Sequence, residues 1–303
     1  RTDRRVYALR YISSGTNKHK VEYNFSENPL GHGAFGQVYP GVRVRDGKEV
    51  AVKVLKETKI TRFSTLRGDR VPTEVAMLET IASPSFGGVI LMLDYFKRDD
   101  RWFIVMERPK ASQDLFDHIS DKVSLDENTA RGFMAQVVGA VRHCRSRGII
   151  HMDIKEENLL LDLETGELKL IDFGSALYIR DAVCDSFCGT RECLPPEAIR
   201  GEESPQAEYV EAWSLGILLY GMVHGYLPFD TDADIVRAKA SFKDGLSDAC
   251  RDLISRCLRV KPEERATLEQ ILDHPWMTTK VEPLDASGLL PPVRSISLRA
   301  RWR

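Results

Sequence analysis

The stretch His151-Met-Asp-Ile-Lys-Glu-Glu-Asn158, with Asp172-Phe-Gly174 downstream, brings together the residue types that phosphoryl transfer requires. This reaction depends on positioning, on charge neutralisation and on an acceptor for the proton of the attacking hydroxyl. Asp153 can accept that proton, and Lys155 can contact the transferring phosphate. Asn158 and Asp172 can ligate Mg²⁺. Any one of these side chains alone would be better explained as a surface charge, but their order and spacing predict a site that transfers phosphate from ATP.

Two motifs nearer the N-terminus fit the same chemistry. Gly31-His-Gly-Ala-Phe-Gly36, followed by Val38, can lie flat on phosphates and expose backbone N–H groups to them. Lys53, in Ala51-Val-Lys53, can hold the α- and β-phosphates, and Glu74 can fix its ammonium group through a buried ion pair. Alone, the glycines would indicate a tight turn and the lysine a solvated charge at the edge of a strand.

The C-terminal half contains matching structural motifs. Pro195-Pro-Glu197 stands where kinases carry Ala-Pro-Glu, and Arg265 is expected to form a salt bridge with Glu197. Trp213-Ser-Leu-Gly216 fits the central helix of a kinase C-lobe. Together with the phosphate-binding motifs, these segments predict a protein kinase.

Hydrophobic patterning predicts a β-rich half followed by a helical half. The expected class is α+β, a bilobal kinase fold with an antiparallel five-stranded sheet and one main helix, hinged to a mostly helical lobe, with ATP in the cleft. The strands are expected at 25–30, 37–43, 49–55, 89–95 and 102–106, and the helices at 70–82, 113–120, 126–147, 207–225 and 247–258. The expected parts are a flexible basic leader (1–22), an N-lobe (23–106), a hinge (107–112), a C-lobe (113–277) and a tail (278–303).

The hinge points to one family. Glu107-Arg-Pro109 follows Met106 at the gatekeeper position, and a Glu-Arg-Pro hinge with one extra residue is characteristic of Pim kinases. From about residue 23 to residue 277 the chain resembles this serine/threonine kinase family. Proline lacks an N–H group, so Glu107 can accept a hydrogen bond from adenine while the usual second bond is missing. A more distant likeness to PAS-domain kinases, at Phe187-Cys-Gly-Thr190, does not extend to this hinge.

Other Pim-like stretches are Arg70-Val-Pro-Thr-Glu74, Gln113-Asp-Leu-Phe-Asp117, Ala140-Val-Arg-His-Cys144, Gly166-Glu-Leu-Lys-Leu-Ile-Asp-Phe-Gly-Ser175 and Trp213-Ser-Leu-Gly-Ile-Leu-Leu-Tyr220. The resemblance implies that ATP contacts Leu30, Gly31, Gly33, Phe35, Gly36, Val38, Ala51, Lys53, Met106, Glu107 and Leu160.

Three positions depart from the family or from kinases in general. Met152 replaces the arginine of His-Arg-Asp, which in many kinases captures a phosphate on the activation loop. We therefore expect activity without such phosphorylation. Glu211 replaces the usual aspartate of the central helix, where it would cap the backbone of the catalytic loop. Tyr226 stands where Pim kinases carry an acidic residue.

The resemblance also implies substrates in which basic residues precede the serine or threonine. It places Asp114, Asp117 and Glu157 beside the substrate groove, where carboxylates can bind arginine bidentately. Asp230, Asp232 and Asp234 either extend this site or form a solvated loop. Lys155 favours serine/threonine over tyrosine specificity. Because Ser13 and Ser297 each follow an arginine by three residues, autophosphorylation of one of them is expected.

The composition limits the partners and the cellular compartment that we expect. A net charge of -2 over 303 residues argues against a nucleic-acid partner, and no apolar run is long enough for a membrane span. The cysteines lack metal-ligand spacing and are expected to be free thiols in the cytoplasm or nucleus: Cys144, Cys184, Cys188, Cys193, Cys250 and Cys257. A monomer is expected from the resemblance.

Two alternatives remain. The first is a pseudokinase scaffold that binds nucleotide but transfers phosphate poorly, favoured only by Met152. The second is a small-molecule kinase, which would lack the Pro-Pro-Glu segment and the stretch Gly189-Thr190 that shapes a peptide platform.

Overall fold

The structure is a computed structural model that describes residues 7–10, 21–26, 28–33, 36–181, 190–202 and 206–279. It divides into two compact units between Lys110 and Ala111, a boundary inside the hinge expected at 107–112. The expected positions Ser13, Phe35, Cys184, Cys188 and Ser297 lie outside the described residues. The fold class is that of a protein kinase, with an antiparallel sheet in the first unit and mainly helices in the second.

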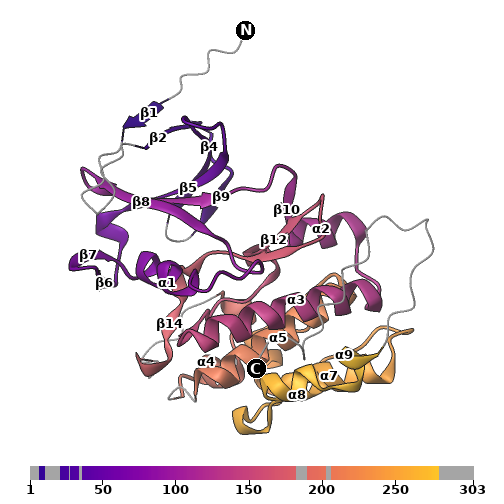
Figure 1. The fold of residues 1–303 in the computed structure, drawn as a ribbon. Helices are drawn as coiled ribbons and strands as arrows, with labels where there is room; N and C mark the ends of the chain where they lie inside the picture. The colour runs from indigo at the N-terminus through magenta and orange to yellow at the C-terminus, as the bar shows by residue number, and fades with distance from the viewer. Residues whose placement is uncertain are drawn as a thin grey trace. The chain divides into compact units, whose positions relative to one another are not determined.

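The sheet of the first unit has the strand order β1-β2-β4-β5-β9-β8, and β3 also pairs with β4 (Figure 1). All of its pairings are antiparallel. One face carries the core cluster of Tyr23, Val50, Val52, Phe96, Phe103 and Val105. The strands are β1 (Tyr7–Arg10), β2 (Glu22–Phe25), β3 (Gly31–Gly33), β4 (Gly36–Arg43), β5 (Glu49–Lys56), β8 (Met92–Arg98) and β9 (Arg101–Glu107).

The strand expected at 25–30 is instead two shorter segments, β2 and β3. Pairing with β4 stops at Phe25 opposite Gly41 and resumes at Gly31 opposite Val38. Pro40 lies opposite this gap, and a proline has no N–H to donate to a ladder. The leader expected at 1–22 also differs, because β1 pairs with β2 along its whole length.

A hairpin precedes the main helix of this unit. Strands β6 (Phe63–Leu66) and β7 (Asp69–Pro72) pair across Arg67 and Gly68, which both have positive φ. Helix α1 (Thr73–Ile81) follows. The helix expected at 70–82 therefore begins three residues later, because residues 70–72 belong to β7. A two-residue turn with positive φ at both positions is typical of hairpins, so the Arg-Gly pair was the missed signal.

The second unit contains the remaining elements, among which α3 and α5 are the longest helices (Figure 1). Its strands are β10 (Ser112–Asp114), β11 (Ile149–Ile150), β12 (Leu159–Asp162), β13 (Leu168–Leu170) and β14 (Leu177–Tyr178). Its α-helices are α2 (Leu115–Lys122), α3 (Glu127–Ser146), α4 (Pro196–Arg200), α5 (Ala207–His224), α6 (Asp232–Arg237), α7 (Asp248–Cys257), α8 (Leu268–Leu272) and α9 (Pro275–Thr278). Short 3₁₀ turns of the two units are η1 (Glu57–Lys59), η2 (Glu156–Asn158), η3 (Phe173–Ser175), η4 (Ile179–Asp181), η5 (Arg191–Cys193) and η6 (Pro262–Glu264).

Capping residues explain why the helix predictions were accurate here. The Asp126 side chain accepts the backbone N–H groups of residues 128 and 129 at the start of α3, and Ser247 caps α7 in the same way. Helix α5 ends at Gly225, which has a φ of +83° and lies so close to the end of α2 that an added Cβ would be 1.8 Å from the carbonyl oxygen of Val123. Only glycine satisfies both conditions. No helix of the described residues is long and apolar enough to span a membrane.

The predicted salt bridge between Glu197 and Arg265 is present and buried. Arg265 Nη1 and Nη2 lie 2.7 and 2.6 Å from the two carboxylate oxygens of Glu197. The guanidinium also donates to the carbonyls of Arg259 and Tyr209 and lies 5.0 Å from the centre of the Trp213 ring. This pair therefore connects α4, α5 and the segment after η6.

Arg265→Met should lower the free energy of unfolding by about 3–5 kcal/mol, because it leaves the buried carboxylate of Glu197 without its partner. Arg256→Met removes an exposed pair with Asp252 and should cost about 1 kcal/mol or less. Urea denaturation of the two variants measures the difference, and equal losses would contradict the structural role of Arg265.

Candidate functional site

The predicted ion pair between Lys53 of β5 and Glu74 of α1 is present. Lys53 Nζ lies 2.6 Å from Glu74 Oε1, and both side chains are less than a tenth exposed. A buried charge requires a nearby partner, and this one holds the ammonium group in a single position. The lysine is therefore preorganised to hold anionic groups.

Four of the expected ATP-binding residues share one face of the sheet. Val38 lies directly opposite Lys53, and Ala51 lies opposite Met106. Because side chains alternate along a strand, Lys53 and Ala51 point to the same side. This face therefore combines a fixed cation with small and apolar side chains, which suits a nucleotide with a flat base and charged phosphates.

The glycine motif approaches the neighbouring strand closely. Gly31 and Gly33 lie in β3 and Gly36 begins β4. A Cβ at Gly36 would be 2.5 Å from the carbonyl oxygen of Val54, so a larger residue would push β4 away from β5. At Gly31 an added Cβ would meet nothing within 4 Å, so packing does not explain that glycine. Leu30, just before it, is half exposed.

Hydrogen bonds from both its side chain and its backbone hold the hinge residue Glu107 in place. Its Oε1 accepts the backbone N–H of Leu91 at 3.0 Å, and its N–H donates to the carbonyl oxygen of Leu91 at 2.9 Å. Arg108 lies 3.8 Å from Glu49. Pro109 follows and has no N–H group, so the second hydrogen bond that most kinases give to adenine has no donor at that residue, as expected.

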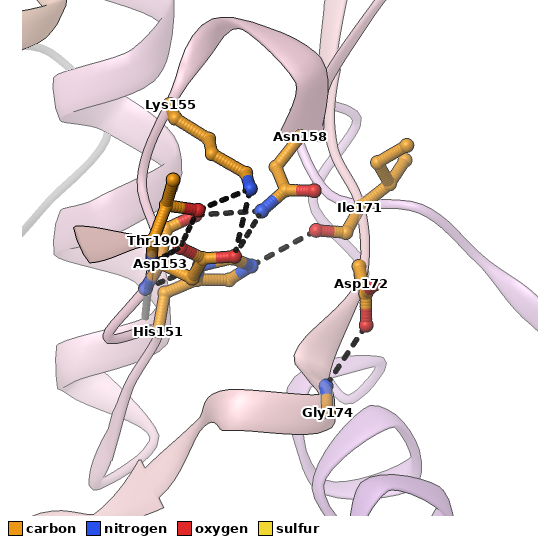
Figure 2. Close-up of polar contacts among 8 residues, drawn as sticks. All are labelled: His151, Asp153, Lys155, Asn158, Ile171, Asp172, Gly174 and Thr190. Carbon is orange, nitrogen blue, oxygen red and sulfur yellow. Dashed lines mark hydrogen bonds and ion pairs between the residues drawn. The ribbon is translucent and has the colours of Figure 1, made fainter. Parts of the chain in front are cut away.

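Figure 2 shows the polar network around Asp153 in the second unit. The Asn158 side-chain amide donates to the Asp153 carbonyl oxygen at 2.7 Å and to its Oδ2 at 2.9 Å. Lys155 Nζ lies 3.5 Å from the same Oδ2. Thr190 donates to Asp153 Oδ1 and accepts from Lys155 Nζ at 2.5 Å. The carboxylate is thus held from two sides by neutral or cationic donors.

Thr190 was not among the predicted site residues, although the stretch containing it was expected to shape a peptide platform. Its hydroxyl lies within hydrogen-bonding distance of both Lys155 and Asp153. A threonine far along the chain gives no local signal of such a contact. Only tertiary structure could reveal this role.

Two oxygen donors beside this network fit Mg²⁺. The amide nitrogen of Asn158 is engaged with Asp153, which leaves its oxygen as the available ligand atom (Figure 2). Ile171 donates its N–H to the Asn158 carbonyl oxygen at 2.9 Å, which brings Asp172 next to Asn158. Mg²⁺ typically takes one or two carboxylates together with phosphate and water oxygens. No trio of His, Cys, Asp or Glu gathers as a metal site among the described residues.

The two ring nitrogens of His151 hydrogen-bond to the backbone at Asp153 and at Ile171. The Asp153 N–H donates to His151 Nδ1 at 3.3 Å, and His151 Nε2 lies 2.9 Å from the carbonyl oxygen of Ile171. Since Nδ1 accepts, Nε2 carries the proton and donates to Ile171. Phe173 packs edge-on against the same ring at 4.8 Å. His151 thereby connects the strand end before Asp153 to the segment that carries Asp172.

Met152 is buried rather than presented to an anion. Its side chain is 6% exposed and packs with Ile150, Ala207 and Val210. Its φ is +65°, a conformation that is strained for a residue with a side chain. The apolar cluster that surrounds Met152 therefore holds the catalytic loop in this conformation without a charge.

The expected capping role of Glu211 is wrong for this chain. Both of its carboxyl oxygens are buried without a hydrogen-bond partner in the described part of the chain. Arg145 Nη1 is 3.8 Å away, and Arg145 also hydrogen-bonds to Glu208. Burial raises the pKa of Glu211 to about 8 despite the opposing effect of Arg145. At neutral pH the group is a carboxylic acid.

The expected substrate carboxylates influence one another. Asp114 caps α2 by accepting the Asp117 N–H at 2.8 Å, and Asp117 and Glu157 are exposed. Burial raises the pKa of Asp114, and the charges of Asp117 and Glu157 raise it further. The structure therefore brings these three carboxylates together. Of the acidic 230–234 segment, Asp232 pairs with Arg191 at 2.6 Å and Asp234 pairs with Arg237 at 3.3 Å.

Residues 25–277 match the family described as protein kinase domain. The chain is 43% identical over 284 residues to serine/threonine-protein kinase pim-2 of Danio rerio, and the match covers 91% of each chain. The chain belongs to the Pim family of serine/threonine protein kinases. This kinase is also 37% identical over 283 residues to serine/threonine-protein kinase prk-2 of Caenorhabditis elegans, covering 90% of this chain and 62% of that protein. The PAS domain-containing serine/threonine-protein kinase of Mus musculus is 36% identical over 267 residues, which cover 86% of this chain and 19% of that protein.

Glu211→Gln should change how stability depends on pH. In the folded kinase the carboxyl stays protonated up to about pH 8, whereas in the unfolded chain it ionises around the usual glutamate pKa of 4.5. Its contribution to stability is therefore complete below pH 4.5 and is lost as the pH rises to 8. Glutamine cannot ionise, so the Tm advantage of the variant over wild type should be larger at about pH 8 than at about pH 5. Thermal unfolding at both pH values, with the exposed Glu269→Gln as control, measures this, and an unchanged difference would count against a neutral Glu211.

Proposed function

We propose that this kinase transfers the γ-phosphate of ATP, with Mg²⁺, to serine or threonine in arginine-rich peptide contexts. The observation that carries the proposal is the network around Asp153. Asn158 donates to its Oδ2 at 2.9 Å, and within the described residues its Oδ1 has only longer contacts, 3.3 and 3.4 Å, with Thr190. Oδ1 is therefore the better placed atom to accept a substrate proton.

Each of these residues has a separate role in the proposed reaction. The substrate hydroxyl oxygen attacks the γ-phosphorus, its proton goes to Asp153, and the bond to the β,γ-bridging oxygen breaks to release ADP. Lys155 neutralises charge on the transferring group, and Lys53 holds the α- and β-phosphates. Asn158 and Asp172 would hold Mg²⁺, which supplies charge neutralisation on the phosphates.

The basic substrate preference follows from the three carboxylates near α2. Asp117 and Glu157 are exposed, and their charges add to the effect of burial in raising the pKa of Asp114. Like charges held together are relieved by a cation, and the arginine fork matches carboxylate geometry. Peptide arginines would bind here with favourable electrostatics.

Regulation follows from Met152. Its buried thioether side chain has no charge with which to capture an activation-loop phosphate. We therefore propose activity that does not depend on activation-loop phosphorylation.

We also propose a cellular compartment and an oligomeric state. The four cysteines that the structure describes are free thiols, which supports a reducing compartment such as the cytoplasm or nucleus. We further propose a monomer, on the basis of the family resemblance.

The first test is transfer of labelled γ-phosphate from ATP–Mg²⁺ to a serine peptide with several preceding arginines. We expect transfer by wild type, a loss of roughly a thousandfold or more in Asp153→Asn, because the proton acceptor is removed, and weak transfer to a peptide with alanines in place of arginines. Equal use of both peptides would refute the basic preference. ATP binding without transfer above the Asp153→Asn level would favour the pseudokinase alternative.

Phosphatase treatment tests regulation. Complete dephosphorylation, checked by mass spectrometry, should leave kcat/KM for the peptide within about twofold, since Met152 offers no charged phosphate receptor. A kinase that captures an activation-loop phosphate through arginine serves as the positive control and should lose activity. A large loss here would overturn independence from activation-loop phosphate.

A further inference from the structure

Gly221 lies inside helix α5, where a glycine is unfavourable unless the structure requires it. A Cβ added at this residue would lie 2.0 Å from Oε1 of Glu156 and 3.2 Å from its Cδ. The three nearest heavy atoms outside its own stretch of helix all belong to Glu156. The missing side chain of Gly221 therefore leaves a slot in α5, and the end of the Glu156 side chain occupies it.

Another glycine of α5, Gly216, has a different explanation. A Cβ there would lie 2.6 Å from the Cβ of Cys257 and 2.9 Å from a methyl group of Leu258, so Gly216 lets α5 pack closely against α7. At Gly221 the neighbour is instead the flexible end of a side chain from the segment that follows Asp153. An alanine at position 221 would therefore expel this side chain from the slot without separating two helices.

Glu156 contacts α5 while its neighbours in the turn η2 contact Asp153. The Glu156 side chain is 7% exposed. Lys155 Nζ lies 3.5 Å from Asp153 Oδ2, and the Asn158 amide donates to the same oxygen at 2.9 Å (Figure 2). The backbone of η2 is closed by hydrogen bonds from the Asn158 N–H to Lys155 and from the Leu159 N–H to Glu156. A short 3₁₀ turn has little rigidity of its own, so the contact of Glu156 with α5 gives it a second point of attachment.

The segment η5 adjoins the same carboxyl group. Cys193 of η5 is partly buried, and burial raises the pKa of its thiol to about 12, with the charge of Glu156 as the next cause. Just before this segment, Thr190 contacts both Lys155 and Asp153. Glu156 therefore lies where η2, α5 and η5 approach one another.

We propose that Glu156 is a positioning residue, whose side chain in the slot at Gly221 holds η2 in place. Lys155 is thereby directed to the transferring phosphate and Glu157 to a peptide arginine. The inference rests on the proposed peptide-kinase function and deepens it. Glu156 is itself buried, so it acts through the residues on either side of it in the chain. The slot and the side chain are a matched pair, and a change in either one should have the same effect.

A double-mutant cycle tests the matched pair, with kcat and KM measured for the arginine-rich serine peptide. Glu156→Ala and Gly221→Ala should each lower kcat/KM by roughly tenfold to a hundredfold, because a small misplacement of reacting groups is costly. The double variant should match Glu156→Ala, since without the glutamate the added methyl group displaces nothing. ATP binding measured without Mg²⁺ should be unchanged, because Lys53 and Glu107 belong to the first unit.

Two further measurements separate positioning from other effects. Glu156→Gln keeps the length and shape of the side chain and should retain most of the activity. Hydrogen exchange reports on the turn without requiring phosphate transfer. The amide protons of Asn158 and Leu159 should exchange faster in each single alanine variant than in the wild type or Glu156→Gln, and the double variant should again match Glu156→Ala.

Gly132→Ala is the matched control. Gly132 also lies inside a helix, α3, but a Cβ added there would meet nothing within 4 Å. This variant should change neither the kinetics nor the exchange. Thermal unfolding verifies that each variant is folded, and if Gly221→Ala does not fold, the comparison of Glu156→Ala with Glu156→Gln decides.

The outcomes distinguish this inference from the proposed function. Losses that multiply in the double variant, or a Glu156→Gln as impaired as Glu156→Ala, would show that occupation of the slot does not position the turn. If the wild type transfers phosphate and the alanine variants do so equally well, the positioning role is refuted and the kinase function stands. If the wild type transfers no phosphate but exchange follows the expected pattern, the proposed function fails and the role of Glu156 in holding η2 stands. Equal exchange in all variants refutes that role in either case.

Discussion

The hydrogen bonds from the Asn158 amide to Asp153 are the constraint on which the catalytic arrangement depends. One side-chain nitrogen meets both the carbonyl and the carboxylate of Asp153. These two hydrogen bonds fix the orientation of the Asp153 carboxylate. Because the amide nitrogen of Asn158 faces Asp153, the amide oxygen is the atom left to ligate the proposed Mg²⁺. The proton acceptor and the proposed Mg²⁺ ligand are therefore set by the same rotamer. Lys155 and Thr190 act on a carboxylate whose orientation is already restricted.

Packing and neutral hydrogen bonds replace charge in the surroundings of this loop. Met152 lies in an apolar cluster with residues of α5, and Glu211 of the same helix is protonated at neutral pH because burial raises its pKa. An arginine at position 152 would need a partner in this environment, and a buried unpaired charge is costly. The loop instead relies on His151, which accepts from Asp153 and donates to Ile171. The apolar side chain at position 152 offers no charge to a phosphate, and this supports the proposal of activity that does not depend on activation-loop phosphorylation.

Sequence reasoning succeeded where recognisable motifs carry the chemistry. The grouping of Asp153 with Asn158 and the Lys53–Glu74 and Glu197–Arg265 pairs were predicted from motif order and spacing. It failed where the deciding partner belongs to no such motif. Pro40 interrupts the pairing of the neighbouring strand, and Thr190 reaches Asp153 from far along the chain. The absence of a cap at Glu211 within the described residues depends on the depth of its burial, which no local pattern expresses.

Acidic side chains near α2 and the catalytic loop make one another harder to ionise. Asp114 already has a raised pKa, from burial and from the charges of Asp117 and Glu157. Burial likewise raises the pKa of Glu156 to about 7, with Glu157 adding to the effect. A peptide arginine bound beside these carboxyl groups, as proposed above, would relieve the repulsion.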